Sequence, residues 1–309
     1  MKKDFLKLLD YSPEELDYLL RLADRLKFNQ KSGIETKPLE GKTLGMIFMK
    51  SSTRTRVSFE TGIYQLGGQG LFLSPRDLQI GRGEPIQDTA RVLSRYLDGI
   101  MIRTFAQQEV EDLAKYASIP IINGLTDFCH PCQVMADLQT IREYKGGTEG
   151  RKLCYVGDGN NMANSLIVGG LKAGMSVSIA CPDNYRPDPI VLDFAKQYGD
   201  KFVVTSDIAA ATKDADVLYT DVWASMGQEG EAEERKKIFK DYCINMDVCA
   251  NAAKDVMVMH CLPAHRGEEI MDDVFEAHAN EIFDEAENRL HAQKAIMYYT
   301  MGDTSELVL

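Results

Sequence analysis

The stretch SSTRTR, residues 51–56, combines four hydroxyl side chains with two arginines. It follows the apolar run 44–49, and apolar residues recur at helical spacing after it, so we expect a buried strand and then a helix beginning near Thr53. The first N–H groups of a helix lack acceptors within the helix, and the helix dipole favours an anion there. Hydroxyl donors and a forked guanidinium add to this. The pattern therefore predicts a phosphate cradle made of Ser52, Thr53, Arg54 and Thr55. The competing interpretation is an N-cap followed by surface arginines paired with acids.

Polar residues of unusual type also follow the other apolar runs. In the first half, Arg103 follows the run 99–102, and His130 opens a helical stretch after the run 119–122. Because ligands of open α/β sheets bind beyond the carboxyl ends of the strands, Arg103 is a candidate for the same anion. In the second half, the corresponding segments are GDGNN (157–161), DVWASMG (221–227) and Cys261-Leu262-Pro263.

Short apolar runs alternate with helical patterns along the whole chain. This alternation is typical of parallel sheets covered by helices on both faces. The expected strands are 44–49, 99–102, 119–122, 153–156, 176–180, 202–204, 217–220 and 256–260. We therefore expect an α/β protein with two domains, each a parallel sheet flanked by helices, and an active site in the cleft between them.

A polar segment with three glycines, residues 142–152, interrupts these patterns and predicts a domain boundary near residue 147. The first domain would comprise residues 1–147 and the second residues 148–285, and a chain of 309 residues is long enough for two such cores. The last expected helix, within residues 286–309, would pack back on the first domain.

The composition excludes several classes of protein. The formal net charge of −12 disfavours binding to nucleic acid or to an anionic membrane. No apolar run approaches the roughly 18 residues that a membrane helix needs, and the N-terminal stretch lacks the apolar core of a signal peptide. Seven scattered cysteines without a secretion signal favour reduced thiols, so we expect a cytoplasmic protein.

Two motifs suggest a metal or a nucleotide but are incomplete. Cys129 and Cys132 form a CxxC, yet no second ligand pair at matching spacing completes a structural zinc site. GDGNN has the first two glycines of a dinucleotide fingerprint, but Met162 occupies the third glycine position. We expect neither a metal nor a cofactor.

Taken together, the motifs resemble those of the aspartate/ornithine carbamoyltransferase family. SSTRTR (51–56) and HPCQ (130–133) look like its carbamoyl phosphate signature, and GDGNN (157–161) also matches the family. DVWASMG (221–227) and HCLPAHRGEE (260–269) resemble the ornithine carbamoyltransferase branch in particular. The resemblance covers essentially the whole chain, with the motifs in the same order.

The resemblance implies a role for each matching residue. Carbamoyl phosphate would contact Ser52, Thr53, Arg54, Thr55, Arg103, His130, Pro131, Cys132, Gln133, Cys261, Leu262 and Arg289. Gln79 would reach the phosphate from a neighbouring subunit of the family's homotrimer, so that subunits share active sites. L-Ornithine would contact Asn161, Asp221, Ser225 and Met226. The catalytic candidates are Arg103, His130 and Cys261, whereas Arg56 would be a structural ion-pair partner.

The implied reaction is transfer of the carbamoyl group to the δ-amine of L-ornithine, giving L-citrulline and phosphate. Such a reaction needs no covalent intermediate, because it depends on positioning an anion and an uncharged amine and on donors to a tetrahedral oxyanion. A sister transferase for another amine, such as putrescine or aspartate, stays open, and so does a non-catalytic phosphate-binding protein. Biosynthetic and catabolic members share these motifs, so the direction of use stays open too.

Overall fold

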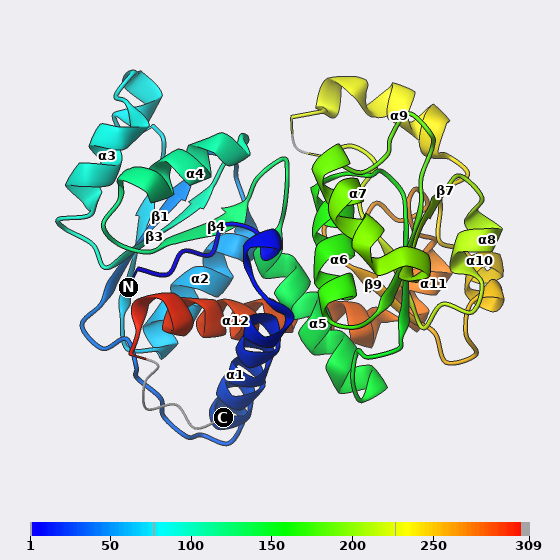
Figure 1. Cartoon of the computed structure of the whole chain (residues 1–309), viewed down its shortest axis with the longest axis horizontal. Coiled ribbons are helices and arrows are strands. Elements are labelled where there is room, and N and C mark those ends of the chain that lie inside the picture. Colours follow the sequence, from blue (N-terminus) through cyan, green and yellow to red (C-terminus); the bar gives the residue numbers. More distant parts are fainter. Residues whose placement is uncertain (1, 77, 226, 304–309) are drawn as a thin grey trace. The chain divides into compact units, whose positions relative to one another are not determined.

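The computed structural model describes residues 2–76, 78–225 and 227–303, which fold into two compact units (Figure 1). Unit 1 comprises Met1–Ala136 and Asn288–Leu309, and unit 2 comprises Asp137–Glu287. Two helices, α5 (Pro131–Lys145) and α12 (Ala279–Met301), run from one unit into the other.

Unit 1 contains a four-stranded parallel sheet with the strand order β2-β1-β3-β4. Its strands are β1 (Thr43–Phe48), β2 (Gln69–Leu73), β3 (Gly99–Arg103) and β4 (Ile121–Leu125). Besides α5 and α12, its helices are η1 (Leu8–Asp10), α1 (Pro13–Lys31), α2 (Thr53–Gln65), η2 (Ile80–Arg82), α3 (Ile86–Leu93) and α4 (Gln107–Tyr116). All side chains of β3 and β4 are buried, as expected for strands covered on both faces.

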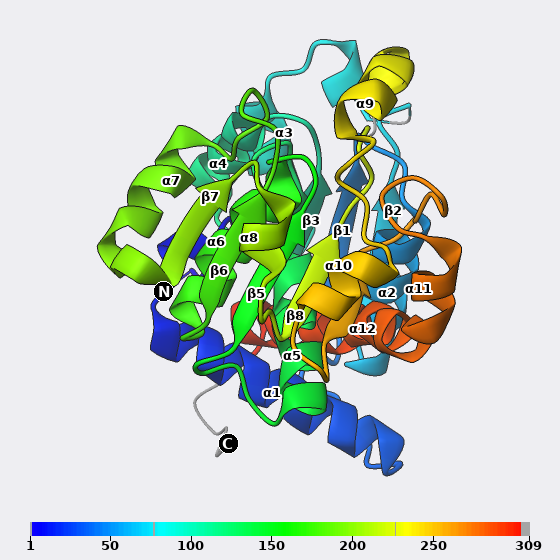
Figure 2. The same ribbon diagram turned by 90° about the vertical axis from the view of Figure 1, so that its right-hand side faces the viewer.

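Unit 2 contains a five-stranded parallel sheet with the strand order β7-β6-β5-β8-β9 (Figure 2). The strands are β5 (Lys152–Val156), β6 (Ser176–Ala180), β7 (Phe202–Thr205), β8 (Val217–Thr220) and β9 (Met257–His260). The helices between them are α6 (Asn161–Lys172), α7 (Pro189–Ala195), η3 (Lys196–Lys201), α8 (Ile208–Thr212), η4 (Glu229–Glu231), α9 (Ala232–Phe239), α10 (Met246–Asn251) and α11 (Asp272–Ala277).

Each sheet reverses its strand order at one point, between β1 and β3 in unit 1 and between β5 and β8 in unit 2. The connections after the two central strands leave in opposite directions there, and open α/β sheets bind ligands in the resulting crevice. In unit 1 the register sets Phe48 opposite Arg103, so SSTRTR and Arg103 lie at the same edge. In unit 2 the register sets Val156 opposite Thr220, so GDGNN and DVWASMG lie at the same edge.

The expected two parallel-sheet domains flanked by helices are confirmed, and so are all the expected strands, with small shifts at their ends. The strand β2 was missed. It is a five-residue edge strand that carries the short apolar run 71–73, but its side chains are exposed or only partly buried because it lies at the edge of the sheet.

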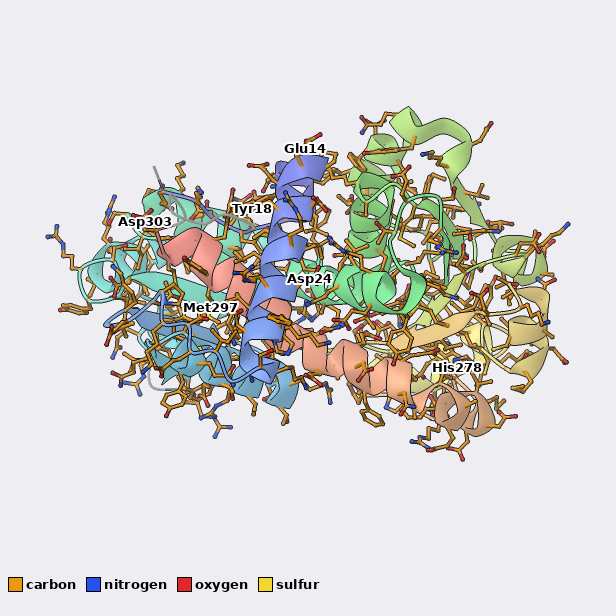
Figure 3. All side chains as sticks on the ribbon, turned by 90° about the horizontal axis from the view of Figure 1, so that it is seen from below. Glu14, Tyr18, Asp24, His278, Met297 and Asp303 are labelled. Atoms are coloured by element: carbon orange, nitrogen blue, oxygen red, sulfur yellow. The ribbon has the colours of Figure 1, made fainter. Side chains whose placement is uncertain are left out.

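The C-terminal part of α12 packs against α1 and α2 within unit 1, and Figure 3 shows α1 lying across it. The Lys294 ammonium donates to Gln30 of α1 at 2.7 Å and to Gln65 of α2 at 3.0 Å. Gly62 of α2 allows close contact, because a Cβ there would lie 2.8 Å from Met297 Cε. This packing places Arg289 of α12 beside the N-terminus of α2.

The domain boundary expected near residue 147 stays a prediction. The chain passes from the first compact unit to the second inside α5, between Ala136 and Asp137. Across the described residues, every helix is too short or too polar to serve as a membrane span.

Candidate functional site

The helix α2 begins at Thr53, as expected, and Ser52 is its N-cap. The Ser52 hydroxyl oxygen accepts a hydrogen bond from the Thr55 N–H at 3.2 Å. A hydroxyl that accepts in this way keeps its own proton for a further acceptor. The N-terminus of α2 therefore offers backbone and hydroxyl donors at the carboxyl edge of the sheet.

The two arginines of SSTRTR differ in their surroundings. Arg56 donates to Glu60 at 3.0 Å and lies over the Phe72 ring at 3.7 Å, so its charge is compensated within α2. Arg54 forms no ion pair with any residue that the structure describes. Of the two arginines of SSTRTR, Arg54 is therefore the one that an anion at the helix N-terminus can recruit.

Two further guanidinium groups converge on the side chain of Thr55. The Thr55 hydroxyl oxygen accepts from Arg289 Nη2 at 3.0 Å and from Arg103 Nη1 at 3.4 Å. Arg289 Nη1 also donates to Gln133 Oε1 at 2.5 Å. All four side chains are buried, so the charges of the two arginines act in a medium of low polarity.

His130 lies directly before α5 in this same group of residues and is buried. Burial, reinforced by the charges of Arg289 and Arg103, lowers the pKa of His130 well below its usual range. The imidazole is therefore neutral near pH 7 and carries one N–H donor. A neutral imidazole can donate this N–H to a carbonyl oxygen of a ligand.

The two residues after His130 contribute differently. Pro131 is the first residue of α5. The Cys132 thiol donates to the Asn123 carbonyl at 3.3 Å, and burial raises its pKa to about 12. Neither Cys132 nor Cys129 belongs to a group of three potential metal ligands among the residues described here. This CxxC therefore packs inside unit 1.

Gln79 lies immediately before η2, and its side chain is exposed. Sequence reasoning assigned no role to Lys50. Its buried ammonium donates to Asp127 at 2.5 Å and lies 4.3 Å from the centre of the Phe105 ring. This contact connects the segment before α2 to the segment before His130.

In unit 2, Asp221 lies directly after β8 and is buried. Its Oδ2 accepts from the Asn160 amide at 3.0 Å, and its Oδ1 accepts from the Cys261 thiol at 3.1 Å. Asn160 is also the N-cap of α6, which begins at Asn161. The segments after β5, β8 and β9 thus meet at one carboxylate.

Cys261 is a protonated thiol in this setting. Burial and then the Asp221 charge raise its pKa well above the usual value. A thiol that donates to a carboxylate is not a thiolate nucleophile. The cysteine is therefore suited to hydrogen bonding and to packing against a ligand.

The residues on either side of Cys261 hold it in a defined turn. Leu262 adopts a left-handed φ of 59°, which is uncommon for a residue with a branched side chain. The Leu262 N–H donates to His260 Nδ1 at 2.9 Å, which assigns the ring proton to Nε2, and Nε2 lies 3.0 Å from Glu269 Oε1. The HCLPAHRGEE motif thus orders its own turn.

Two residues of the DVWASMG motif remain. The Ser225 N–H donates to Gln228 Oε1 at 3.0 Å in the segment that leads to η4. Met226 lies outside the described residues.

Sequence reasoning missed a buried acidic pair in unit 2. Burial and then Asp137 raise the pKa of Glu285 well above its usual range. Tyr219 donates to Glu285 at 3.0 Å, and the His260 N–H donates to it at 2.9 Å. A signal for Asp137 was present in the sequence, because this acid lies among the apolar residues Val134, Met135, Leu138 and Ile141, which recur at helical spacing.

Within the described residues, Asp221, His260 and Cys261 offer ligand atoms that lie within 4.8 Å of one another, and so do His265, Glu268 and Glu269. The first group is held by the hydrogen bonds just described. That the protein needs no metal or cofactor stays a prediction.

Two family models match nearly the whole chain. The model described as the aspartate/ornithine carbamoyltransferase carbamoyl-P binding domain matches residues 3–143, and the one described as the Asp/Orn binding domain matches residues 149–300.

Individual relatives agree with these models. A protein named ornithine carbamoyltransferase from Oceanobacillus iheyensis is 61% identical over 305 residues, which cover 97% of this chain and 95% of that protein. A protein named anabolic ornithine carbamoyltransferase from Pyrococcus furiosus is 55% identical over 304 residues, which cover 97% of this chain and 96% of that protein. A solved structure of ornithine carbamoyltransferase from Pyrococcus furiosus superposes with a TM-score of 0.92 at 54% identity, covering 97% of each chain.

Proposed function

The chain belongs to the aspartate/ornithine carbamoyltransferase family, and from this membership and the geometry above we propose that it transfers the carbamoyl group of carbamoyl phosphate to the δ-amine of L-ornithine, giving L-citrulline and phosphate. The names of relatives at 55% and 61% identity fit ornithine and do not fit the putrescine alternative. Residues 1–147 would be the carbamoyl phosphate-binding domain and residues 148–285 the ornithine-binding domain.

One observation in unit 1 carries the proposal. Arg103 and Arg289 both donate to Thr55, one residue after Arg54 at the N-terminus of α2. An acidic protein gathers these cations against its overall charge, and forked guanidinium groups together with a helix N-terminus suit a phosphate dianion.

The same cluster supplies the donors that the transition state needs. Attack by the uncharged amine on the carbamoyl carbon creates a tetrahedral oxyanion as the C–N bond forms. Phosphate then leaves with the electrons of the C–O bond, and the proton that the attacking nitrogen loses balances the charge of the product as hydrogen phosphate. Arg103, the neutral His130 and Thr55 would donate to that oxygen. Losing one such preorganised donor costs on the order of 2.7–4 kcal/mol of transition-state stabilisation.

The residues around Asp221 would bind the amine substrate. A buried carboxylate attracts an ammonium group, and the Asn160 amide and the Cys261 thiol fix its orientation. Asn161 and Ser225 would bind the amino acid, while Cys261 and Leu262 would contact the carbamoyl group. An active site in the cleft between the domains stays a prediction.

We also propose that the protein is a cytoplasmic homotrimer of arginine biosynthesis. The word anabolic in the name of the Pyrococcus furiosus relative supports the biosynthetic direction. Gln79 has the exposure that a residue needs in order to reach the phosphate of a neighbouring subunit.

A colorimetric ureido assay tests the function. Wild-type protein is incubated with carbamoyl phosphate and ornithine, putrescine or aspartate, and with no amine as a blank. The Arg103→Gln variant serves as the impaired control, and Arg186→Gln serves as a surface control because Arg186 pairs with exposed Asp183. We expect ornithine to be carbamoylated fastest. Faster turnover of putrescine or aspartate would overturn the substrate, and a folded protein without turnover of any amine would point to a phosphate-binding protein.

A further inference from the structure

We propose that Arg235 is a positioning residue for the amine substrate: it fixes the segment after β8 against the segment after β5. This inference rests on the proposed function and deepens it. Arg235 belongs to none of the motifs identified in the sequence.

The guanidinium of Arg235 is buried and makes three hydrogen bonds from α9. Its Nη1 donates to Asp158 Oδ2 at 2.7 Å and to the Trp223 carbonyl at 2.9 Å. Its Nε donates to Glu231 Oε2 at 3.3 Å. The same group lies 5.2 Å from the centre of the Tyr185 ring. Only a planar, forked cation meets all of these at once, and a lysine does not.

These contacts close a ring around the proposed amine site. Asp158 lies two residues before Asn160, and Asn160 donates to Asp221. Trp223 lies two residues after Asp221 and returns to Arg235 through its carbonyl. The Asp221 carboxylate is thus held from the β5 side by Asn160 and from its own segment by Arg235.

Arg235 also contacts one residue before Ser225 and one residue after it. Trp223 precedes Ser225 and Glu231 follows it, and both accept hydrogen bonds from the one guanidinium. Because Trp223 is held before a ligand binds, residues 221–225 lose less conformational entropy on binding.

A simple stabilising ion pair is the competing explanation, and the variants separate the two. Removing Arg235 alone leaves Asp158 buried without its cation, which by itself can impair folding. The double variant Asp158→Asn/Arg235→Gln removes both charges, keeps side chains of similar size and still lacks the bonds to Trp223 and Glu231. Arg186→Gln is the matched control, because the Arg186–Asp183 pair has the same 2.7 Å distance but is exposed.

Steady-state kinetics on the full-length protein measure KM for ornithine and for carbamoyl phosphate separately. Both Arg235→Gln and the double variant lose buried hydrogen bonds to a charged group. We therefore expect KM for ornithine to rise at least about tenfold in each of them. KM for carbamoyl phosphate should stay near the wild-type value. Arg235→Lys should lie in between, and Arg186→Gln should match the wild type. Thermal unfolding verifies that the double variant is folded.

The inference is overturned if the folded double variant keeps the wild-type KM for ornithine, or if both KM values rise together. Failure of the proposed function looks different, because the wild type itself would then not turn over ornithine. In that case, hydrogen exchange of the backbone amides of residues 221–225 decides: faster exchange in the folded double variant than in the Arg186→Gln control supports the positioning role, and equal exchange rejects it.

Discussion

The arginines of SSTRTR offer a test within a single helix turn. We predict that Arg54→Gln weakens binding of carbamoyl phosphate, whereas Arg56→Gln does not. Both changes remove one charge from the first turn of α2 and keep a side chain of similar length. They differ in what the guanidinium faces: Arg56 is paired with Glu60 and lies on Phe72, and Arg54 forms no ion pair among the described residues.

The magnitude follows from the kind of contact that is lost. Hydrogen bonds to a charged group contribute about 1.5–3 kcal/mol, and each 1.4 kcal/mol is tenfold in affinity, so Arg54→Gln should raise Kd by roughly 10- to 150-fold. An exposed helical ion pair such as Arg56–Glu60 contributes about 0.3–0.5 kcal/mol to folding, and the ring contact adds about 0.5–1 kcal/mol. Arg56→Gln should therefore lower stability by about 1 kcal/mol and leave Kd within roughly twofold of wild type.

Isothermal titration calorimetry with carbamoyl phosphate, and with inorganic phosphate as a stable anion, measures both constants. Urea unfolding without ligand measures stability. An unchanged Kd for Arg54→Gln would refute the phosphate cradle, and an equal rise in Kd for the two variants would show that only net charge matters.

Three further predictions use other parts of the structure. Asp221→Asn should raise KM for ornithine at least about tenfold and spare carbamoyl phosphate binding, and an equal loss of both would mean that Asp221 is structural. Burial lowers the pKa of His130, so below about pH 6.5 the unfolded chain binds a proton at His130 that the folded chain does not bind. The contribution of the neutral His130 to the free energy of unfolding is therefore fully present above that pH and is lost below it. Chemical denaturation between about pH 7 and 5 should therefore show a shallower loss for His130→Gln than for wild type. Gly62→Leu should destabilise the protein by about 1–3 kcal/mol because its side chain would meet Met297, whereas Gly62→Ala should cost less than about 1 kcal/mol, as urea midpoints would show.

Much of the local structure could be predicted because its causes are local. Apolar runs and their spacing located the covered strands, and the hydroxyls before Thr53 located the start of α2. The edge strand β2 was missed although it carries the apolar run 71–73, because its place at the exposed edge of the sheet is set by the strand order and not by its own residues.

The sequence by itself determined the chemistry available at each strand end: hydroxyls and arginines after β1, amides after β5, a carboxylate after β8 and a thiol after β9. It determined the family too, because several motifs in a fixed order have little chance of arising independently. These properties belong to short segments and need no knowledge of packing.

Only the tertiary structure decided which of these groups meet. Arg289 contacts Thr55 across 234 positions, and Arg235 contacts Asp158 across 77, distances over which no local periodicity carries information. The packing of α12 on α2 and the reversal of strand order within each sheet bring such residues together. Burial then sets their chemistry: it keeps His130 neutral and Cys261 protonated, because a charged form would lose its hydration in the interior.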